Sequence, residues 1–470
     1  MPGTTEPTVT RRMAEWAASV RYEELPADVV LACKRFLTDS VGCALGGLRQ
    51  HDARVALDVL DEVAGVGPAT VIGSGRRLDP VSAALANSLL IRVMDYNDIY
   101  WKQDPCHPSD LIPAALAAVE RQRGSGRELM VGIAIAYEFA QRLSEASTPG
   151  IREVGWHHAT LTAIAAPIVA GRMLGLNAEK IANAIGIAAS TRATAGAVTA
   201  GRLTMMKNTA DPLAVESGVL AALLAERGFT GPEHVLDGKE GLGQVLGTDW
   251  RWDVLTDGLG EHWRILQCGM KSFPAEALTH APISATLDLV REHELTPDDV
   301  SEVRVRALSR AADILADPSK YDPRTKETAD HSLPYVVAAA LVDRKVTPEQ
   351  FEIARILDPT IRAQLPKIKV TADPEIDAAF PALQRTVVTI VTADGRELTR
   401  QLDYPKGDPR NPMTDVELQE KFDALAGPIC SSERLQKMKA ALRDADRAPD
   451  VSTLLAELKA DRLGALGALV

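Results

Sequence analysis

Long alanine-rich apolar segments constrain the fold of this chain more than any other feature. Residues 161–171 carry Thr162 and otherwise only apolar or small side chains, and similar segments recur. Hydrophobic residues make up 46% of the chain but aromatic residues only 4%. Small side chains allow helices to approach closely, so the pattern indicates helix-on-helix packing rather than a strand-rich sandwich. We therefore expect a mainly α fold.

The spacing of apolar residues and the signals at helix ends predict at least six antiparallel helices in the first half. Asp79-Pro80 and Asp211-Pro212 each resemble an N-cap followed by proline at the first helical position, and Gly228 is typical of a helix end. The expected helices cover residues 28–45, 81–94, 127–145, 158–174, 178–190 and 213–226.

The pattern changes after about Trp263. Residues 301–306 alternate with period two, and residues 386–391 and 397–402 flank a hairpin turn at Ala393-Asp394-Gly395-Arg396. Helical patterning returns after Asp415. We therefore predict a large all-helical domain with an inserted smaller α+β lid domain. The expected bounds are 1–265 for the helical domain, 266–407 for the lid and 408–470 for C-terminal helices that return to the helical domain.

Charge and composition exclude several functional classes. A formal net charge of -12 without a long basic run argues against nucleic acid as a partner. The five cysteines are scattered and odd in number, which predicts no disulfide framework and a reducing compartment. We see no export signal and no apolar run of the roughly 20 residues that a membrane span needs. These features predict a cytoplasmic protein with no membrane partner.

Motifs for metals and nucleotides are missing. The sequence has no C-x-x-C cluster, no H-E-x-x-H, no phosphate-binding loop and no G-x-S-x-G elbow. The adjacent His157 and His158 would point to different sides of a helix or strand. We therefore expect acid–base chemistry with no metal and no cofactor.

Several polar residues are candidates for that chemistry. Each has a structural interpretation of its own, as a helix cap, a loop lysine or a core tyrosine. A histidine suits a base near pH 7 because its reference pKa is about 6.5, whereas an ordinary lysine, at about 10.4, serves better as a fixed cation. Together they could bind carboxylates and move protons. The candidates are Asp95 in Asp95-Tyr96-Asn97-Asp98, His107 in His107-Pro108-Ser109-Asp110, His158, Lys207, Lys271 and Tyr335.

The order of these motifs resembles the MmgE/PrpD family, which includes 2-methylcitrate dehydratases, cis-aconitate decarboxylase and an iminodisuccinate epimerase. The resemblance runs from about Arg21 to Phe422. Besides the candidates, it rests on the His158 helix ending in Gly171-Arg172-Met173-Leu174-Gly175-Leu176, on residues 216–224, on Lys271-Ser272-Phe273-Pro274-Ala275-Glu276, on Ser332-Leu333-Pro334-Tyr335 and on Tyr404-Pro405-Lys406-Gly407-Asp408.

The resemblance implies a homodimer with a metal-free pocket between two domains. It implies that His107, His158, Lys207, Lys271 and Tyr335 are catalytic, and that Asp95, Lys207 and Lys271 bind substrate. His157 is the alternative to His158, and Cys106 is either a small loop residue or a substrate contact.

The expected function is that of a hydro-lyase that removes a proton next to a carboxylate of a di- or tricarboxylate such as 2-methylcitrate. An epimerase, a cis-aconitate decarboxylase and, least favoured, a non-enzymatic binding protein are the alternatives.

Overall fold

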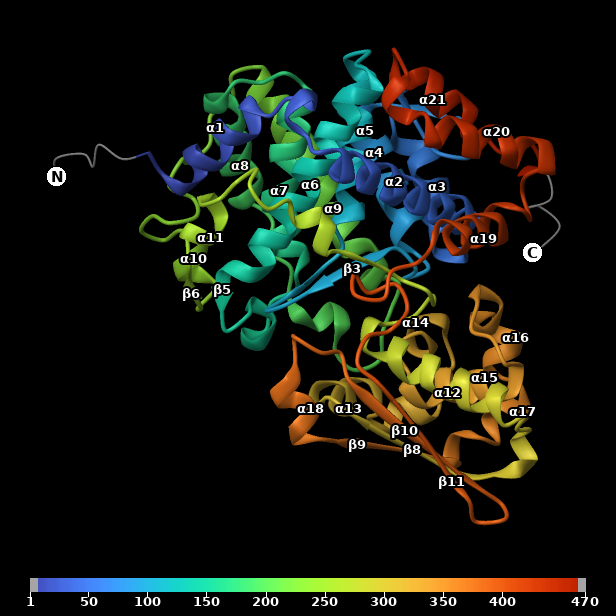
Figure 1. Cartoon of the computed structure of the whole chain (residues 1–470). Helices are drawn as coiled ribbons and strands as arrows, with labels where there is room; N and C mark the ends of the chain where they lie inside the picture. The colour runs from blue at the N-terminus through green and yellow to red at the C-terminus, as the bar shows by residue number, and fades with distance from the viewer. Residues whose placement is uncertain (1–6, 464–470) are drawn as a thin grey trace.

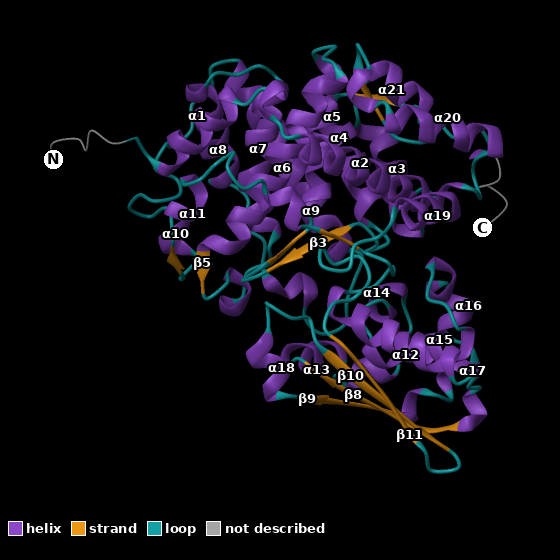
Figure 2. Cartoon of the chain, viewed as in Figure 1, coloured by secondary structure: helices purple, strands orange, loops and turns teal. Residues whose placement is uncertain are grey.

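In the computed structural model, which describes residues 7–463, helices form most of the molecule and the strands are few and short (Figure 2). The expected mainly α fold is therefore confirmed. The predicted outer bounds, residues 1 and 470, lie outside the described residues. The division of the chain at residues 265 and 407 stays a prediction.

The larger part of the molecule is a body of helices (Figure 1). The C-terminal helices lie beside α2, α5 and α6 in this body. Its helices are α1 (Val9–Ser19), α2 (Ala27–Gly47), α3 (His51–Val63), α4 (Pro80–Arg92), α5 (Ile112–Arg121), α6 (Gly126–Ala146), α7 (Ala159–Met173), α8 (Ala178–Ala189), α9 (Met206–Glu226), α10 (Leu242–Val245), α11 (Asp253–Thr256), α19 (Asp415–Ala426), α20 (Ser432–Arg443) and α21 (Val451–Glu457). Two small antiparallel pairs join β1 (Ala69–Thr70) to β2 (Arg77–Leu78) and β5 (Ser147–Thr148) to β6 (Asp249–Trp250).

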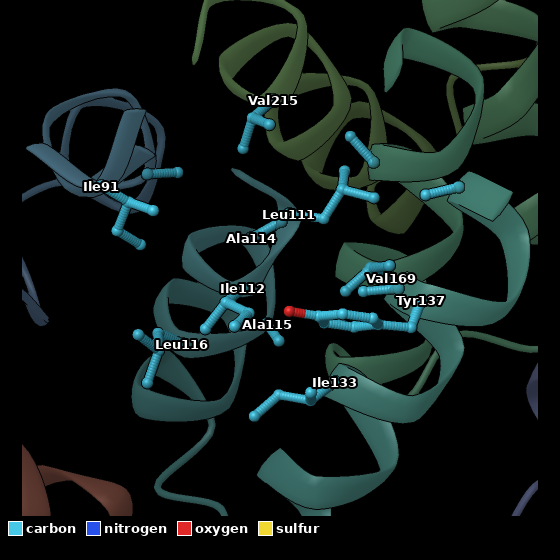
Figure 3. Packing of buried hydrophobic residues seen from close by; sticks show 14 of the residues in the cluster. Ile91, Leu111, Ile112, Ala114, Ala115, Leu116, Ile133, Tyr137, Val169 and Val215 are labelled. Carbon is cyan, nitrogen blue, oxygen red and sulfur yellow. The ribbon is translucent and has the colours of Figure 1, made fainter. Parts of the chain in front are cut away.

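Small side chains let these helices approach closely, as the composition predicts. A Cβ atom added to Gly218 of α9 would lie 2.3 Å from the Cβ atom of Ala166 on α7. Figure 3 shows the same principle around Tyr137, whose ring packs among aliphatic side chains and alanines from neighbouring helices. Close packing of this kind maximises dispersion contacts, so even one added methyl group would force neighbouring atoms apart and destabilise the fold.

One helix start was predicted wrongly. Asp79 does cap α4, because its carboxylate accepts hydrogen bonds from the backbone N–H groups of Val81 and Ser82. Asp211-Pro212, in contrast, lies inside α9, which begins at Met206. The Asp211 carboxylate is free for other contacts there, and it accepts a 2.6 Å hydrogen bond from the Thr162 hydroxyl on α7.

The smaller part of the molecule has its own hydrophobic core, built mainly from residues between Ala275 and Ile390. Its sheet has the order β11-β10-β8-β9, in which only the β8–β9 pair is parallel, and the predicted hairpin is present with Val391 opposite Glu397. The strands are β8 (Val300–Ala307), β9 (Ile368–Ala372), β10 (Thr386–Thr392) and β11 (Glu397–Leu402). The helices are α12 (His280–Glu292), α13 (Ser309–Leu315), α14 (Lys326–Ala329), α15 (Leu333–Asp343), α16 (Ile353–Ile356), α17 (Pro359–Arg362) and α18 (Pro374–Ala379).

A three-stranded sheet lies where the two parts meet (Figure 1). Its central strand β3 (Asp98–Trp101) pairs with β4 (Pro105–Cys106) on one side and with β7 (Gly269–Met270) on the other. This pairing places the segment before His107 and the segment before Lys271 on opposite sides of the same strand. None of the helices between residues 7 and 463 combines the length and apolarity needed to cross a membrane.

Candidate active site

The two motifs on either side of β3 and β4 interlock through buried hydrogen bonds. The Asp98 carboxylate accepts bonds from the backbone N–H of Ser109 at 2.9 Å and from its hydroxyl at 2.6 Å. The Asn97 amide donates to the Ser109 hydroxyl at 2.9 Å and to Asp110 at 3.0 Å. These bonds fix the backbone between Asp95 and Asp110 and therefore the direction of His107.

A cavity of about 50 Å³ lies against this segment. A larger cavity of about 460 Å³ adjoins it, and the two share Ile99, Trp101, Lys271 and Ala277 in their linings. The smaller cavity holds the predicted acid–base residues His107 and His158, whereas the larger one is lined by β3, by residues 266–271 and by loop residues near Pro381 and Pro405. The smaller cavity is therefore the candidate active site. Its titratable lining residues are Arg92, Asp95, His107, Arg152, His157, His158, Lys271, Glu276, Lys320 and His331.

His107 is held as a neutral base. Its Nδ1 atom lies 2.6 Å from the carbonyl oxygen of Asp98, which can only accept, so Nδ1 carries the proton of the bond. Burial lowers the pKa of His107 well below its ordinary value, and the nearby charges of Arg92 and Lys271 lower it further. The Nε2 atom therefore keeps its lone pair near neutral pH.

His157 and His158 both line the cavity, with ring centroids 3.9 Å apart. His158 Nε2 lies 3.0 Å from Asp211 Oδ2, and the His158 ring is 5.5 Å from that of His107. Burial alone would raise the pKa of Asp211, but the two imidazoles and Arg92 outweigh it and lower that pKa. His157 instead accepts a hydrogen bond at Nδ1 from Ala159, and burial holds its pKa well below the ordinary value.

Asp95 is the centre of a buried cluster of cations. It follows α4 in the left-handed backbone region, with φ 51°. Its carboxylate lies 2.6 Å from Arg92 and 3.2 Å from Lys207, and it also contacts the ammonium of Lys271. Burial alone would raise the pKa of Asp95, but these three cations hold it well below its ordinary value.

The pKa values of the two lysines of this cluster shift in opposite directions. Lys207 also lies 3.1 Å from Asp330. Burial alone would lower its pKa, but Asp330 and Asp95 raise it above the ordinary value. Burial does lower the pKa of Lys271, because Asp95 offsets it only in part and Arg92 acts in the same direction. Lys207 is thus a fixed cation, whereas Lys271, which borders the cavity, gives up a proton more readily.

The structure does not bring Tyr335 to this cavity. Tyr335 is fully buried in the smaller core beside Phe351, and its hydroxyl donates to the carbonyl oxygen of Gln350. The hydroxyl is therefore occupied, and the geometry gives no support to a catalytic role. Cys106 is buried in β4 and is not in the cavity lining, and burial raises the pKa of its thiol well above the ordinary value.

Several lining residues were not predicted as site residues. Arg92 had the pattern of an ordinary last-turn arginine. Asp211, which does not line the cavity but contacts the lining residue His158, had that of a helix cap. Arg152 stands in no motif at all. Glu276 and His331 lie next to predicted residues, in Lys271-Ser272-Phe273-Pro274-Ala275-Glu276 and Asp330-His331-Ser332, so proximity to those motifs was the available signal.

Two buried groups in the described chain place possible metal ligands within 4.8 Å of one another: His157, His158 and Asp211, and Asp95, Asp330 and His331. In the second group the lysine cations already neutralise the carboxylates, since Lys207 lies within 3.2 Å of both. In the first group, Nδ1 of His157 and the carboxylate of Asp211 already accept hydrogen bonds. The second group is thus engaged with protein partners, whereas Nε2 of His157 in the first group makes no hydrogen bond within the described chain.

Fold and site together define a mainly helical enzyme with histidines and lysines around one buried cavity. The sequence matches the MmgE/PrpD N-terminal domain over residues 11–255 and the MmgE/PrpD C-terminal domain over residues 273–444. These two matches cover most of the chain. The protein belongs to the MmgE/PrpD family, as its motifs suggested, and is an enzyme of that family's lyase type.

Known relatives match nearly end to end. The chain is 26% identical to cis-aconitate decarboxylase of Aspergillus terreus, over 95% of each protein. It is 26% identical to cis-aconitate decarboxylase of Homo sapiens, over 96% of this chain and 95% of the relative. It is 27% identical to 2-methylcitrate dehydratase of Cupriavidus necator, over 86% and 87% respectively.

Proposed function

We propose that this enzyme cleaves a small di- or tricarboxylate by moving a proton to or from the carbon next to a carboxylate. One observation carries the proposal. The imidazoles of His107 and His158, with ring centroids 5.5 Å apart, border the same buried cavity as the ammonium of Lys271. A neutral base and a cation around one small space suit proton transfer beside a carboxylate.

Charge stabilisation is the first requirement of this chemistry. When a proton or carbon dioxide leaves the carbon beside a carboxylate, negative charge spreads onto that carboxylate. Fixed cations in a dry site stabilise this charge far more than water does. In the proposed mechanism Lys271 contacts the carboxylate, and Lys207 and Arg92 maintain the positive field around Asp95.

Proton transfer is the second requirement. The free Nε2 lone pair of His107 makes this residue the proposed base. His158, whose Nε2 atom lies 3.0 Å from the Asp211 carboxylate and whose ring lies beside that of His107, is the proposed partner of His107 in proton transfer. Lys271, with its lowered pKa, is a second proton donor.

Decarboxylation of cis-aconitate is the first candidate reaction. The bond to one carboxylate breaks, carbon dioxide leaves, the electron pair stays on the conjugated carbon skeleton, and an acidic group returns a proton to carbon. The match of relatives named cis-aconitate decarboxylase over 95–96% of this chain supports this candidate.

Dehydration of 2-methylcitrate is the second candidate. Here a base removes the proton from carbon, and the hydroxyl leaves as water after it receives a proton from an acid. Relatives named 2-methylcitrate dehydratase match over 82–87% of the chain. The same residues suit both reactions because both need a cation at the carboxylate and an acid–base pair.

Turnover in deuterated water tests the proposal and separates its candidates. The protein is incubated separately with cis-aconitate, 2-methylcitrate, citrate and iminodisuccinate, and products are followed by NMR. Loss of carbon dioxide with deuterium on carbon supports decarboxylation, and formation of an alkene from 2-methylcitrate supports dehydration. Exchange with inversion but no loss of a group would contradict a lyase. No change in any of the four compounds would reject the proposed function.

Substitutions then test the site. His107→Asn, His158→Asn and Lys271→Ala should each lower kcat by about 100- to 10,000-fold, the range for loss of an acid–base group. His234→Asn and Lys437→Ala are matched controls, because both side chains are largely exposed. Near-wild-type turnover in folded His107→Asn and Lys271→Ala variants would show that the chemistry takes place elsewhere.

A further inference from the structure

Arg152 differs from the other cations around the cavity because its guanidinium has no anionic partner. Within residues 7–463, Arg92 and Lys271 both contact Asp95, and Lys320 lies 3.7 Å from Asp317 and donates to the Gly201 carbonyl oxygen. The contacts of Arg152 are a backbone hydrogen bond and its position over the Trp101 ring. Arg152 lines the cavity, and the N–H donors of its guanidinium have no acceptor among the described contacts.

The backbone of Arg152 is fixed in place. The carboxylate of the fully buried Asp104 accepts hydrogen bonds from the N–H groups of Ile151 at 2.9 Å and Arg152 at 3.0 Å. Gly150 allows this approach, since a Cβ atom there would lie 2.9 Å from the Asp104 carboxylate oxygens. The side chain of Arg152 starts from a rigid turn, so the backbone needs no ordering when the guanidinium binds a ligand.

The surroundings of the guanidinium favour a carboxylate. Its Cζ atom lies over the Trp101 ring, 5.9 Å from the ring centroid, and the ring makes no hydrogen bond to the guanidinium donors. A partly desolvated guanidinium without a partner is costly, and a carboxylate satisfies it with two parallel hydrogen bonds. Glu276 borders the same cavity, but no hydrogen bond joins it to Arg152 among the described contacts.

We infer that Arg152 binds a carboxylate of the substrate other than the one that Lys271 contacts. This assignment rests on the proposed function and adds a requirement to it: the substrate carries at least two carboxylates, and the second one is recognised by a bidentate arginine. Arg152 is then a specificity-determining residue, whereas the proton transfers belong to the histidines and Lys271. Loss of Arg152 should act on binding more than on the chemical step.

Binding of an unreactive tricarboxylate tests this inference without turnover. Tricarballylate has three carboxylates but neither a double bond nor a hydroxyl, and its affinity can be measured by titration calorimetry. Arg152→Met should weaken its binding about 10- to 100-fold, as expected for loss of charged hydrogen bonds. Arg152→Lys keeps the positive charge but not the paired N–H donors of the guanidinium, so its affinity for tricarballylate should lie between those of the wild type and Arg152→Met.

Arg310→Met is the matched control. Arg310 lies over the same Trp101 ring, with its Cζ atom 5.5 Å from the centroid, but it is paired with Glu153 and lines a separate cavity. Its loss should change the affinity less than threefold. An equal effect of Arg310→Met and Arg152→Met would overturn the inference, because it would assign the effect to packing on Trp101.

The outcomes also separate this inference from the proposed reaction. If tricarballylate does not bind the wild type, or binds Arg152→Met as tightly, the inference is wrong whatever the enzyme turns over. If binding depends on Arg152 but none of the tested compounds reacts, the proposed function fails and the carboxylate site stands. Circular dichroism establishes that each variant is folded, and Arg152→Lys decides the matter if Arg152→Met does not fold.

Discussion

At the scale of single residues, burial changes the protonation of groups around the cavity. Glu276 is an example: its carboxylate caps a short turn by accepting a 2.7 Å hydrogen bond from the Leu278 N–H. Burial raises the pKa of Glu276 to about 7, although Lys271 acts in the opposite direction. At neutral pH this side chain exists in both protonation states, which makes it sensitive to pH in the range where the enzyme would be assayed.

Replacement of Glu276 by glutamine should stabilise the protein increasingly as pH rises. The folded pKa exceeds the unfolded value, so the contribution of Glu276 to stability is largest below about pH 4.5 and is lost as pH rises through about 7. Glutamine stays neutral throughout. The free energy of unfolding of Glu276→Gln relative to wild type should therefore rise by about 2 to 3 kcal/mol between about pH 5 and about pH 8. Urea unfolding of both proteins at the two pH values measures this difference.

The exposed Glu420 provides the control for this measurement. Glu420→Gln should show no comparable pH-dependent gain. A Glu276→Gln difference that stays constant between the two pH values would contradict the raised pKa.

How many site residues could be predicted depended on whether they stood in a motif. Asp95, His107, His158 and Lys271 were candidates by residue type and gained support from the resemblance, and the structure brings all four to one cavity. Lys207, predicted with them, contacts Asp95 but does not line that cavity. Arg152 was missed because a single arginine before a turn looks the same whether it points to solvent or to a cavity. Tyr335 was placed in the site by its motif, yet its hydroxyl is taken up by a local carbonyl.

At the scale of secondary structure, close backbone approach fixes the segment before Lys271. Gly407 has φ 94°, and an added Cβ atom would lie only 1.8 Å from the carbonyl oxygen of Met270 in β7. The Met270 N–H also donates to the Gly407 carbonyl oxygen at 2.9 Å. Glycine at 407 therefore allows the loop to pack directly on the strand that leads to Lys271.

Gly407→Ala should destabilise the protein more than Gly395→Ala. Both glycines have positive φ, so both substitutions introduce backbone strain of about 1 to 2 kcal/mol. At Gly395 nothing lies within 4 Å of the added Cβ atom, so strain is the whole effect, whereas at Gly407 the backbone must also move. Thermal and urea unfolding of both variants check this. Equal losses of stability would show that the contact with Met270 relaxes without cost.

Local signals predicted most elements but could not decide every boundary. The start of α4 is a local signal, because the Asp79 side chain bonds to the backbone of the next residues. The hairpin between β10 and β11 is local too, because the type of turn fixes the register of the two strands. Asp211-Pro212 carries the same local signal, yet α9 begins five residues earlier, at Met206. Packing of α9 against α7 and α4 decides that case, and such contacts join segments far apart in the sequence.

At the scale of the whole molecule, one buried ion pair joins distant parts of the chain. Lys421 of α19 lies 2.7 Å from Asp39 of α2 and donates to the carbonyl oxygens of Tyr96 at 2.7 Å and Lys271 at 2.9 Å. Burial alone would lower the pKa of Lys421, but Asp39 raises it. The C-terminal helices thus hold the backbone on both sides of the cavity.

Lys421→Met should lower the free energy of unfolding by about 3 to 5 kcal/mol, because it leaves a buried carboxylate without its partner. Turnover should fall with it, since the backbone of Lys271 loses a contact. Lys439→Met, which removes a partly exposed pair with Asp423, should cost about 1 kcal/mol or less. Similar losses for the two variants would show that Asp39 is easily rehydrated. Urea unfolding and a turnover assay give both answers.

The return of the chain end to α2 has a consequence for biosynthesis. Phe422 packs against Gly42, so part of the face of α2 is covered by a helix that the ribosome makes long after α2. The smaller core, in contrast, is built almost entirely from the single stretch between Ala275 and Ile390, so its residues can pack together once this stretch has left the ribosome. At a synthesis rate of ~5–20 residues per second, this apolar surface of α2 stays uncovered for on the order of tens of seconds before α19 is made. Nascent chains of this protein therefore offer a long-lived binding surface to chaperones while the smaller core already folds.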